Sequence, residues 1–82
     1  MEVEVGKVTH YYSNAKAAIV KLTDTLGIGD KIHITGATTN FEQEVKSMEL
    51  EREKIQAATA GQEIGIAVIK KVRAKDTVYK TE

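Results

Sequence analysis

Short apolar runs that alternate with polar residues are the feature of this sequence that most constrains its fold. β-Branched residues dominate the runs, and turns containing glycine, serine, asparagine or aspartate separate them at intervals of about 8 to 15 residues. No helical periodicity alternates with these runs. The pattern therefore predicts an all-β fold. Closure into a six-stranded β-barrel is expected, because closure removes exposed strand edges.

Two of the expected strands contain a change in the parity of their inward-facing residues. In residues 2–12 the change falls at Gly6, which predicts a β-bulge there. A second change at residues 46–47 predicts a bulge within one long strand over residues 41–50. The side chains expected to point inward are Val3, Val5, Val8, His10, Tyr12, Ile32, Ile34, Phe41, Gln43, Val45, Met48, Leu50, Ile64, Ile66 and Val68.

The other segments are assigned from the same alternation and from turn residues. Ala60–Gly61 marks a turn. The segment 52–59 has good helix formers but no clear cap, so an extended or single-turn crossing is expected. With 82 residues, the chain (1–82) is expected to form a single domain. Further strands are expected over residues 15–22, 31–35, 63–69 and 77–80.

Composition argues against several classes of protein. The absence of cysteine rules out a disulfide framework and a thiolate metal site, and it fits a reducing, cytoplasmic location. The acidic start of the chain does not resemble a signal peptide. No apolar run approaches the roughly 18 residues that span a bilayer. Lys and Arg number 12 and Asp and Glu number 12, so no net charge attracts nucleic acid.

Motifs that carry catalysis are not found. No phosphate-binding loop occurs, and Gly27-Ile28-Gly29 lacks the third glycine of a dinucleotide fingerprint. The two histidines, His10 and His33, have no metal-ligand spacing. A serine nucleophile is supported only by the short separation of His10 and Ser13. The chain is therefore expected to have no catalytic residues, no metal and no cofactor, and not to be an enzyme.

Ligand binding has two candidate segments. Three flat rings at the end of the first strand could stack nucleobases, and a basic run near the C-terminus could contact phosphates. In the alternative interpretation, at least one of these tyrosines packs in the core and the basic run is a solvated turn. The residues concerned are His10, Tyr11, Tyr12, Lys70, Lys71 and Arg73.

Five short motifs occur in a familiar order: Gly6-x-Val8, Leu26 to Ile34 with Gly-Asp inside it, Val45 to Glu49, Ala60 to Ile66, and Val72 to Val78. Together they resemble the second domain of translational GTPases such as elongation factor Tu. The resemblance covers nearly the whole chain and implies a six-stranded Greek-key barrel. Small stand-alone proteins of this type occur in prokaryotes, and a similar barrel lies at the C-terminus of some collagenase-like peptidases.

The resemblance also implies a contact site. In the elongation factors this domain helps to hold the acceptor end of aminoacyl-tRNA, and the glutamate that contacts the terminal adenosine corresponds to Glu49. An asparagine that assists it corresponds to Glu63, a departure that adds negative charge. The face expected to contact RNA carries Glu49, His33 and Arg52.

Two functions follow. The first is a non-catalytic, translation-factor-like module that contacts tRNA or the ribosome. The alternative is a protein–protein interaction barrel that serves as accessory subunit of a partner enzyme such as a collagenase-like peptidase. In the alternative, the acidic segment 42–53 and the basic segment 70–80 dock the partner. The resemblance favours the first function, whereas the balanced net charge favours the second.

Overall fold

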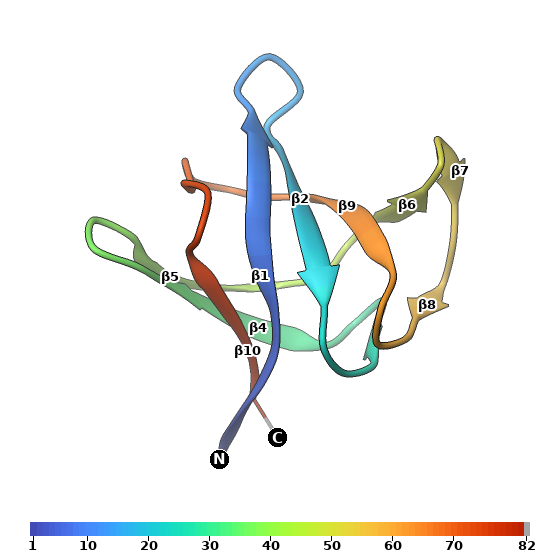
Figure 1. Ribbon diagram of the computed structural model, residues 1–82, viewed down its shortest axis with the longest axis horizontal. Coiled ribbons are helices and arrows are strands. Elements are labelled where there is room, and N and C mark those ends of the chain that lie inside the picture. Colours follow the sequence, from blue (N-terminus) through green and yellow to red (C-terminus); the bar gives the residue numbers. More distant parts are fainter. Residues whose placement is uncertain (82) are drawn as a thin grey trace.

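The computed structural model describes residues 1–81, and all of their regular structure is β (Figure 1). The prediction of an all-β fold is therefore confirmed. Eight strands form one sheet in the order β5-β4-β10-β1-β2-β9-β6-β7, and β3 pairs with β8. The strands are β1 (Glu2–Tyr12), β2 (Ala17–Leu22), β3 (Leu26–Gly27), β4 (Lys31–Thr35), β5 (Asn40–Glu44), β6 (Met48–Leu50), β7 (Glu53–Lys54), β8 (Ala57–Ala58), β9 (Glu63–Ala67) and β10 (Thr77–Thr81).

The large sheet is open, so the prediction of a closed six-stranded barrel is wrong. Its outer strands, β5 and β7, do not pair with each other. On the outer edge of the sheet, the Gln43 side chain of β5 makes hydrogen bonds to the backbone of another segment in place of strand pairing. The Gln43 amide nitrogen donates to the Ala67 carbonyl at 2.8 Å, and its amide oxygen accepts from the Ile69 backbone N–H at 2.8 Å. These two bonds occupy backbone groups that a neighbouring strand would otherwise pair.

The single long strand predicted over residues 41–50 is also not formed. β5 ends at Glu44 and β6 begins at Met48, so the strand is interrupted where a bulge was expected. Between them, the Val45 N–H donates to the Asp30 carbonyl, and the Gly29 N–H donates to the Val45 carbonyl, each at 2.8 Å. The backbone of Val45 is thus held by the loop before β4, and the chain then crosses to a different part of the sheet.

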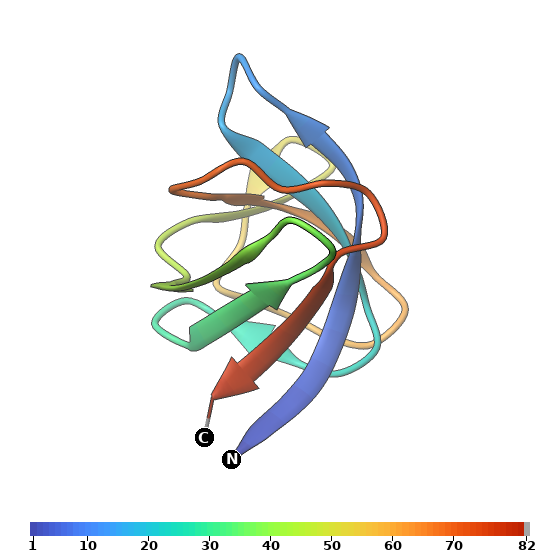
Figure 2. The ribbon, with the colours of Figure 1, turned by 90° about the vertical axis from the view of Figure 1, so that its left-hand side faces the viewer.

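Strand β1 lies inside the sheet and pairs with both β10 and β2, as its course beside β10 in Figure 2 shows. The register with β10 shifts between Glu4 and Gly6, which confirms the bulge predicted at Gly6. The register with β2 shifts again between Val8 and His10. Because of this second shift, His10 and Tyr12 point to solvent, and the prediction that they face inward is wrong.

The core lies inside the curve of the sheet and is almost wholly aliphatic. Most predicted inward residues are buried, whereas Val3, Gln43 and Leu50 are only partly buried. Residues 1–81 contain no helix long and apolar enough to span a membrane. The buried hydrophobic residues are Val5, Val8, Ala18, Val20, Leu22, Leu26, Ile32, Ile34, Phe41, Val45, Met48, Ala58, Ile64, Ile66, Val68, Val72 and Val78.

The remaining segments follow the sequence closely. Residues 52–59 contain β7 and β8 and are mainly extended. An extended segment was one of the two conformations predicted for this crossing. The predicted turn at Ala60–Gly61 is present, and Gly61 has a φ of 92°, which a side chain would strain. The strand expected over 63–69 ends at Ala67, and the last strand runs as β10.

The bulge at Gly6 generates a stability prediction. A Cβ atom at Gly6 would lie 2.7 Å from the Lys21 carbonyl oxygen and 2.7 Å from Val20 Cγ1. Because the first of these atoms is backbone, Gly6→Ala should lower the free energy of unfolding by about 1–3 kcal/mol, the usual range for overpacking. Urea denaturation measures the change.

Gly65→Ala is the matched control, since a Cβ at Gly65 would meet only Ile19 Cδ1, at an ordinary 3.5 Å. Equal stability of the two variants would contradict the close approach of β1 and β2 at Gly6.

Candidate functional site

The outer face of β2 and β9 carries small and apolar side chains where a solvated sheet usually carries polar ones. The register of the two strands sets Ile19 opposite Gly65 and Ala17 opposite Ala67. All four residues line a depression on the surface. Gly65 has no side chain to cover the sheet, so bare backbone is accessible at this point. These four residues form what is called here the groove floor.

One wall of the groove comes from the end of β1. His10 is in register with Ile19, and Tyr12 with Ala17, so both rings stand beside the groove floor. Their centroids are 6.2 Å apart with planes at 87°, an edge-to-face arrangement. Tyr12 remains 52% exposed. This wall exists because the second bulge of β1 turns both residues outward.

The opposite wall comes from β6 and its turn into β7. Glu49 is in register with Gly65 on β9. The two-residue turn that follows consists of Glu51 and Arg52, with φ values of 51° and 70°. Positive φ at both central residues defines a type I′ turn, a conformation that favours Asn-Gly and is strained for other residues. This strained turn supplies two of the residues that line the groove.

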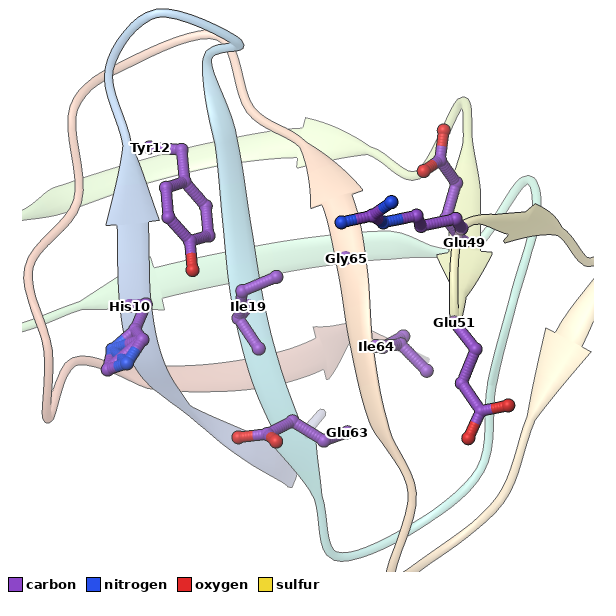
Figure 3. A pocket seen from close by; sticks show the side chains of 9 residues that line it. His10, Tyr12, Ile19, Glu49, Glu51, Glu63, Ile64 and Gly65 are labelled. Carbon is purple, nitrogen blue, oxygen red and sulfur yellow. The ribbon is translucent and has the colours of Figure 1, made fainter.

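Figure 3 shows the resulting groove, with His10 and Tyr12 on one side of the floor and Glu49 and Glu51 on the other. Glu63 lies near one end, and its carboxylate accepts a hydrogen bond of 3.0 Å from the Thr9 hydroxyl. The hollow at this end has a volume of roughly 640 Å³, and an adjoining hollow that reaches Ser47 has roughly 360 Å³. The two share four lining residues, so they form one groove. The shared residues are Tyr12, Ile19, Glu49 and Gly65.

The structure thus brings together five of the ten residues predicted from the sequence to contact a ligand. The other five lie elsewhere. Tyr11 is partly buried against the core, which agrees with the alternative interpretation that one tyrosine packs inward. The basic residues are exposed in the loop between β9 and β10, and His33 belongs to a second cluster. The residues brought together are Glu49, Glu63, Arg52, His10 and Tyr12, and the basic residues of the loop are Lys70, Lys71 and Arg73.

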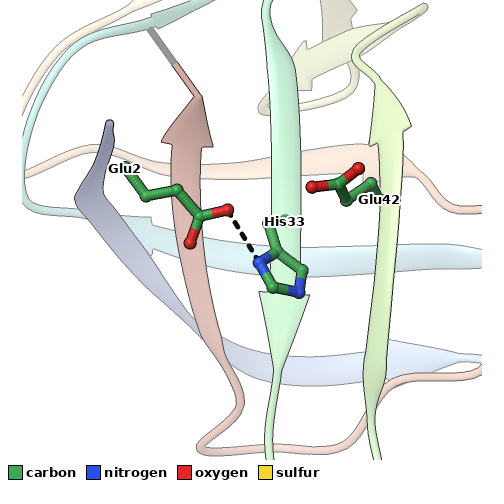
Figure 4. A group of neighbouring side chains, drawn as sticks. All are labelled: Glu2, His33 and Glu42. Atoms are coloured by element: carbon green, nitrogen blue, oxygen red, sulfur yellow. Dashed lines mark hydrogen bonds and ion pairs between the residues drawn. The ribbon is translucent and has the colours of Figure 1, made fainter.

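The second cluster surrounds His33 on the outer face of β4 (Figure 4). Nδ1 of the imidazole lies 2.8 Å from a Glu2 carboxylate oxygen, and Nε2 lies 2.6 Å from the Asn40 amide oxygen. Both nitrogens can donate at once only in the imidazolium form. The hydrogen bond to Asn40 is the largest effect and raises the pKa of His33. Desolvation, the second largest, lowers it, and the Glu2 and Glu42 carboxylates raise it again, so the net shift is upward.

The same cluster is the one group in the described part of the chain that could hold a metal ion. Glu2, His33 and Glu42 each offer a ligand atom, and these atoms lie within 4.8 Å of one another. A cation would have to compete with the proton that joins His33 to Glu2, and with Lys31, whose Nζ lies 3.7 Å from Glu42. The expectation of no metal site remains a prediction.

Comparison with known proteins gives a consistent result. No family model matches the chain. It is 35% identical over 79 residues to a protease of Methanocaldococcus jannaschii, a match that covers 95% of this chain and 19% of that protein. It is 38% identical over 81 residues to a collagenase of Porphyromonas gingivalis, covering 96% of this chain and 20% of the collagenase. The chain therefore spans about one fifth of the length of these relatives.

A solved structure agrees with these matches. The C-terminal domain of a Geobacillus thermoleovorans protein described as a U32 peptidase superposes with a TM-score of 0.89 at 20% sequence identity. The alignment covers 93% of this chain and 96% of that domain. At this identity the likeness concerns the fold. The fold of the present chain is that of a peptidase C-terminal domain.

These comparisons correct the resemblance to domain 2 of elongation factor Tu, which is wrong, as are the RNA-binding and translation-factor roles drawn from it. The short motifs that carried it have structural causes. Gly29 has a φ of 93°, and the Asp30 carboxylate accepts from the Gly27 N–H at 2.8 Å, so Gly-Asp stabilises a turn. Gly61 serves the turn before β9 in the same way. These motifs report turn geometry, and no comparison supports tRNA or the ribosome as a partner.

Sequence reasoning missed the groove floor and Glu51. Ile19 and Gly65 lie on the outward parity of strands whose inward residues were correctly assigned, and that parity was the available signal. Ala17 and Ala67 are small, and their pairing across two strands distant in sequence was not visible in the sequence.

The strained turn between β6 and β7 generates a stability prediction. Replacing Glu51→Asn together with Arg52→Gly should raise the free energy of unfolding by about 1 kcal/mol, because Asn-Gly adopts the type I′ turn without the strain of a left-handed conformation. Thermal denaturation measures the gain. The control is Glu51→Gln with Arg52→Gln, which removes the same charges but keeps the strain; if it stabilises equally, the gain does not come from the turn.

The His33 cluster generates a prediction about pH. Since the folded pKa of His33 is raised above its unfolded value of about 6.5, its contribution to stability is fully present below that pH. The contribution is lost as the pH rises through the folded pKa. The stability difference between the wild type and His33→Gln should therefore shrink with rising pH, as measured by urea denaturation between about pH 5 and 9. A difference that grows with pH would contradict the assignment.

Proposed function

We propose that this chain is a non-catalytic accessory domain of a collagenase-like peptidase. The observation that carries the proposal is the similarity of 93–96% of the chain to about one fifth of proteases and collagenases. The matched proteins thus have four fifths of their length in which catalysis can reside. The proposal corresponds to the alternative drawn from the sequence, in which the chain serves a partner enzyme.

The side chains of the described residues support a non-catalytic role. His10 contacts its neighbour's carbonyl, Thr9 O, through Nδ1 at 2.6 Å, and His33 is engaged by Glu2 and Asn40. Within residues 1–81 neither imidazole hydrogen-bonds a serine hydroxyl, the pairing that activates a serine nucleophile. The structure has a buried aliphatic core and a surface groove, which suits binding and orientation.

A domain exchange tests the proposal. The segment of the Porphyromonas gingivalis collagenase that matches this chain over 81 residues is either deleted or replaced by the present chain. Deletion is expected to reduce collagen hydrolysis, and replacement is expected to restore it, because the accessory domain supplies its contribution without the catalytic centre. The isolated 82-residue chain is expected to hydrolyse nothing.

Thermal denaturation of each hybrid separates function from folding. A replacement hybrid that folds but remains as inactive as the deletion variant would contradict the proposal, as would hydrolysis by the isolated chain.

A further inference from the structure

The groove has the dimensions of an extended peptide. Its walls stand on β1 and β6, which are separated by β2 and β9, so about three strand spacings of 4.8 Å, or about 14 Å, separate the two backbones. Along β9 the groove runs from Glu63 to Ala67, about 13 Å at 3.3 Å per residue. A segment of about four extended residues has this length.

The groove floor suits the main chain and apolar stem of such a segment. Ile19 offers an apolar surface, and Gly65 leaves the sheet uncovered beside it. A peptide backbone can therefore approach the sheet closely at Gly65 without displacing a side chain. The Tyr12 ring borders the same position, and aromatic rings of this kind supply large contact areas in peptide-binding grooves.

The charge of the groove favours a cationic group. Glu49, Glu51 and Glu63 line it, against Arg52 as the one fully charged base among the described lining residues. Lys54 and Lys21 are in register with Glu49 and Glu63, but neither forms an ion pair with them in the part of the chain described. The carboxylates of Glu49 and Glu51 are thus available to a ligand cation, whereas that of Glu63 accepts a hydrogen bond from the Thr9 hydroxyl. All three disfavour a polyanion.

We infer that this groove binds an extended segment of a peptide substrate that carries an arginine or lysine side chain. The stem of that side chain lies on Ile19 and Gly65. Its cation lies between the Tyr12 ring and the Glu49 carboxylate, where cation–π and ionic attraction combine. The inference deepens the proposed function, on which it rests for the role of the peptide: the domain would hold substrate for the catalytic region.

Direct binding to the isolated chain tests the inference without any partner enzyme. The probe is a fluorescein-labelled, C-terminally amidated pentapeptide, Gly-Ala-Arg-Ala-Gly, followed by fluorescence anisotropy at low salt. The reference peptide replaces arginine by citrulline, which keeps the shape and removes the charge. We expect the arginine peptide to bind at least about fivefold more tightly, and the difference to shrink as salt screens the carboxylates.

Three variants locate the binding site. Gly65→Val fills the groove floor and should abolish binding, and its Cβ has room because its nearest neighbour, Ile19 Cδ1, lies 3.5 Å away. Glu49→Gln should weaken binding of the arginine peptide about fivefold and leave the citrulline peptide unaffected. Glu53→Gln removes an exposed carboxylate of β7 outside the groove and should change nothing.

Any of three results would overturn the inference: no binding by the wild type, equal binding of the two peptides, or unchanged binding by a folded Gly65→Val variant. If Gly65→Val instead fails to restore activity in the collagenase hybrid while the wild-type chain binds no peptide, the groove is the docking face for the enzyme. A failed hybrid with intact peptide binding would overturn the accessory role but not the peptide site.

Discussion

The path of β1 is the constraint on which the rest of the structure depends. This strand pairs on one side with β10 and on the other with β2, and two register shifts divide it into parts with different inward parity. The first shift, at Gly6, lets Val5 and Val8 both point into the core. The second, after Val8, turns His10 and Tyr12 to the outside. One strand therefore supplies both the centre of the core and a wall of the groove.

Much of the fold could be predicted because strand alternation and turn glycines are local signals. Alternation with a period of two was enough to predict the burial of Ile32 and Ile34, and of Ile64 and Ile66. The second bulge could not be predicted in this way, since no glycine marks it and aromatic residues at positions 10 and 12 continue the apparent alternation. Barrel closure was beyond reach for a different reason. Closure depends on whether the backbone of β5 pairs with another strand. In the structure the Gln43 side chain of β5 binds the backbone of Ala67 and Ile69 instead, so these groups are not paired with a strand.

The candidate site shows the same division. Five of the ten candidate residues gather in the groove. Strand alternation correctly placed Glu49 outside the core, whereas His10 and Tyr12 reach the groove only because the second bulge of β1 turns them outward. The groove floor between these residues could not be predicted from the sequence. Ile19 faces Gly65 only because β2 and β9, more than forty residues apart in the chain, are neighbours in the sheet. The turn motifs misled in a related way: Gly29 and Gly61 are required by positive φ, so similar motifs arise wherever such turns recur.

A fold shared with a peptidase C-terminal domain carries an acidic, aromatic-walled groove on its outer face. The proposed function of the groove depends on where the peptide lies on that face. Nuclear magnetic resonance measures this most directly, by following the backbone amide signals of the labelled chain as the arginine peptide is added. The account predicts shifts concentrated at Ile19, Gly65 and Glu49. Shifts confined to the β4–β5 face around His33, or no shifts at saturating peptide, would contradict it.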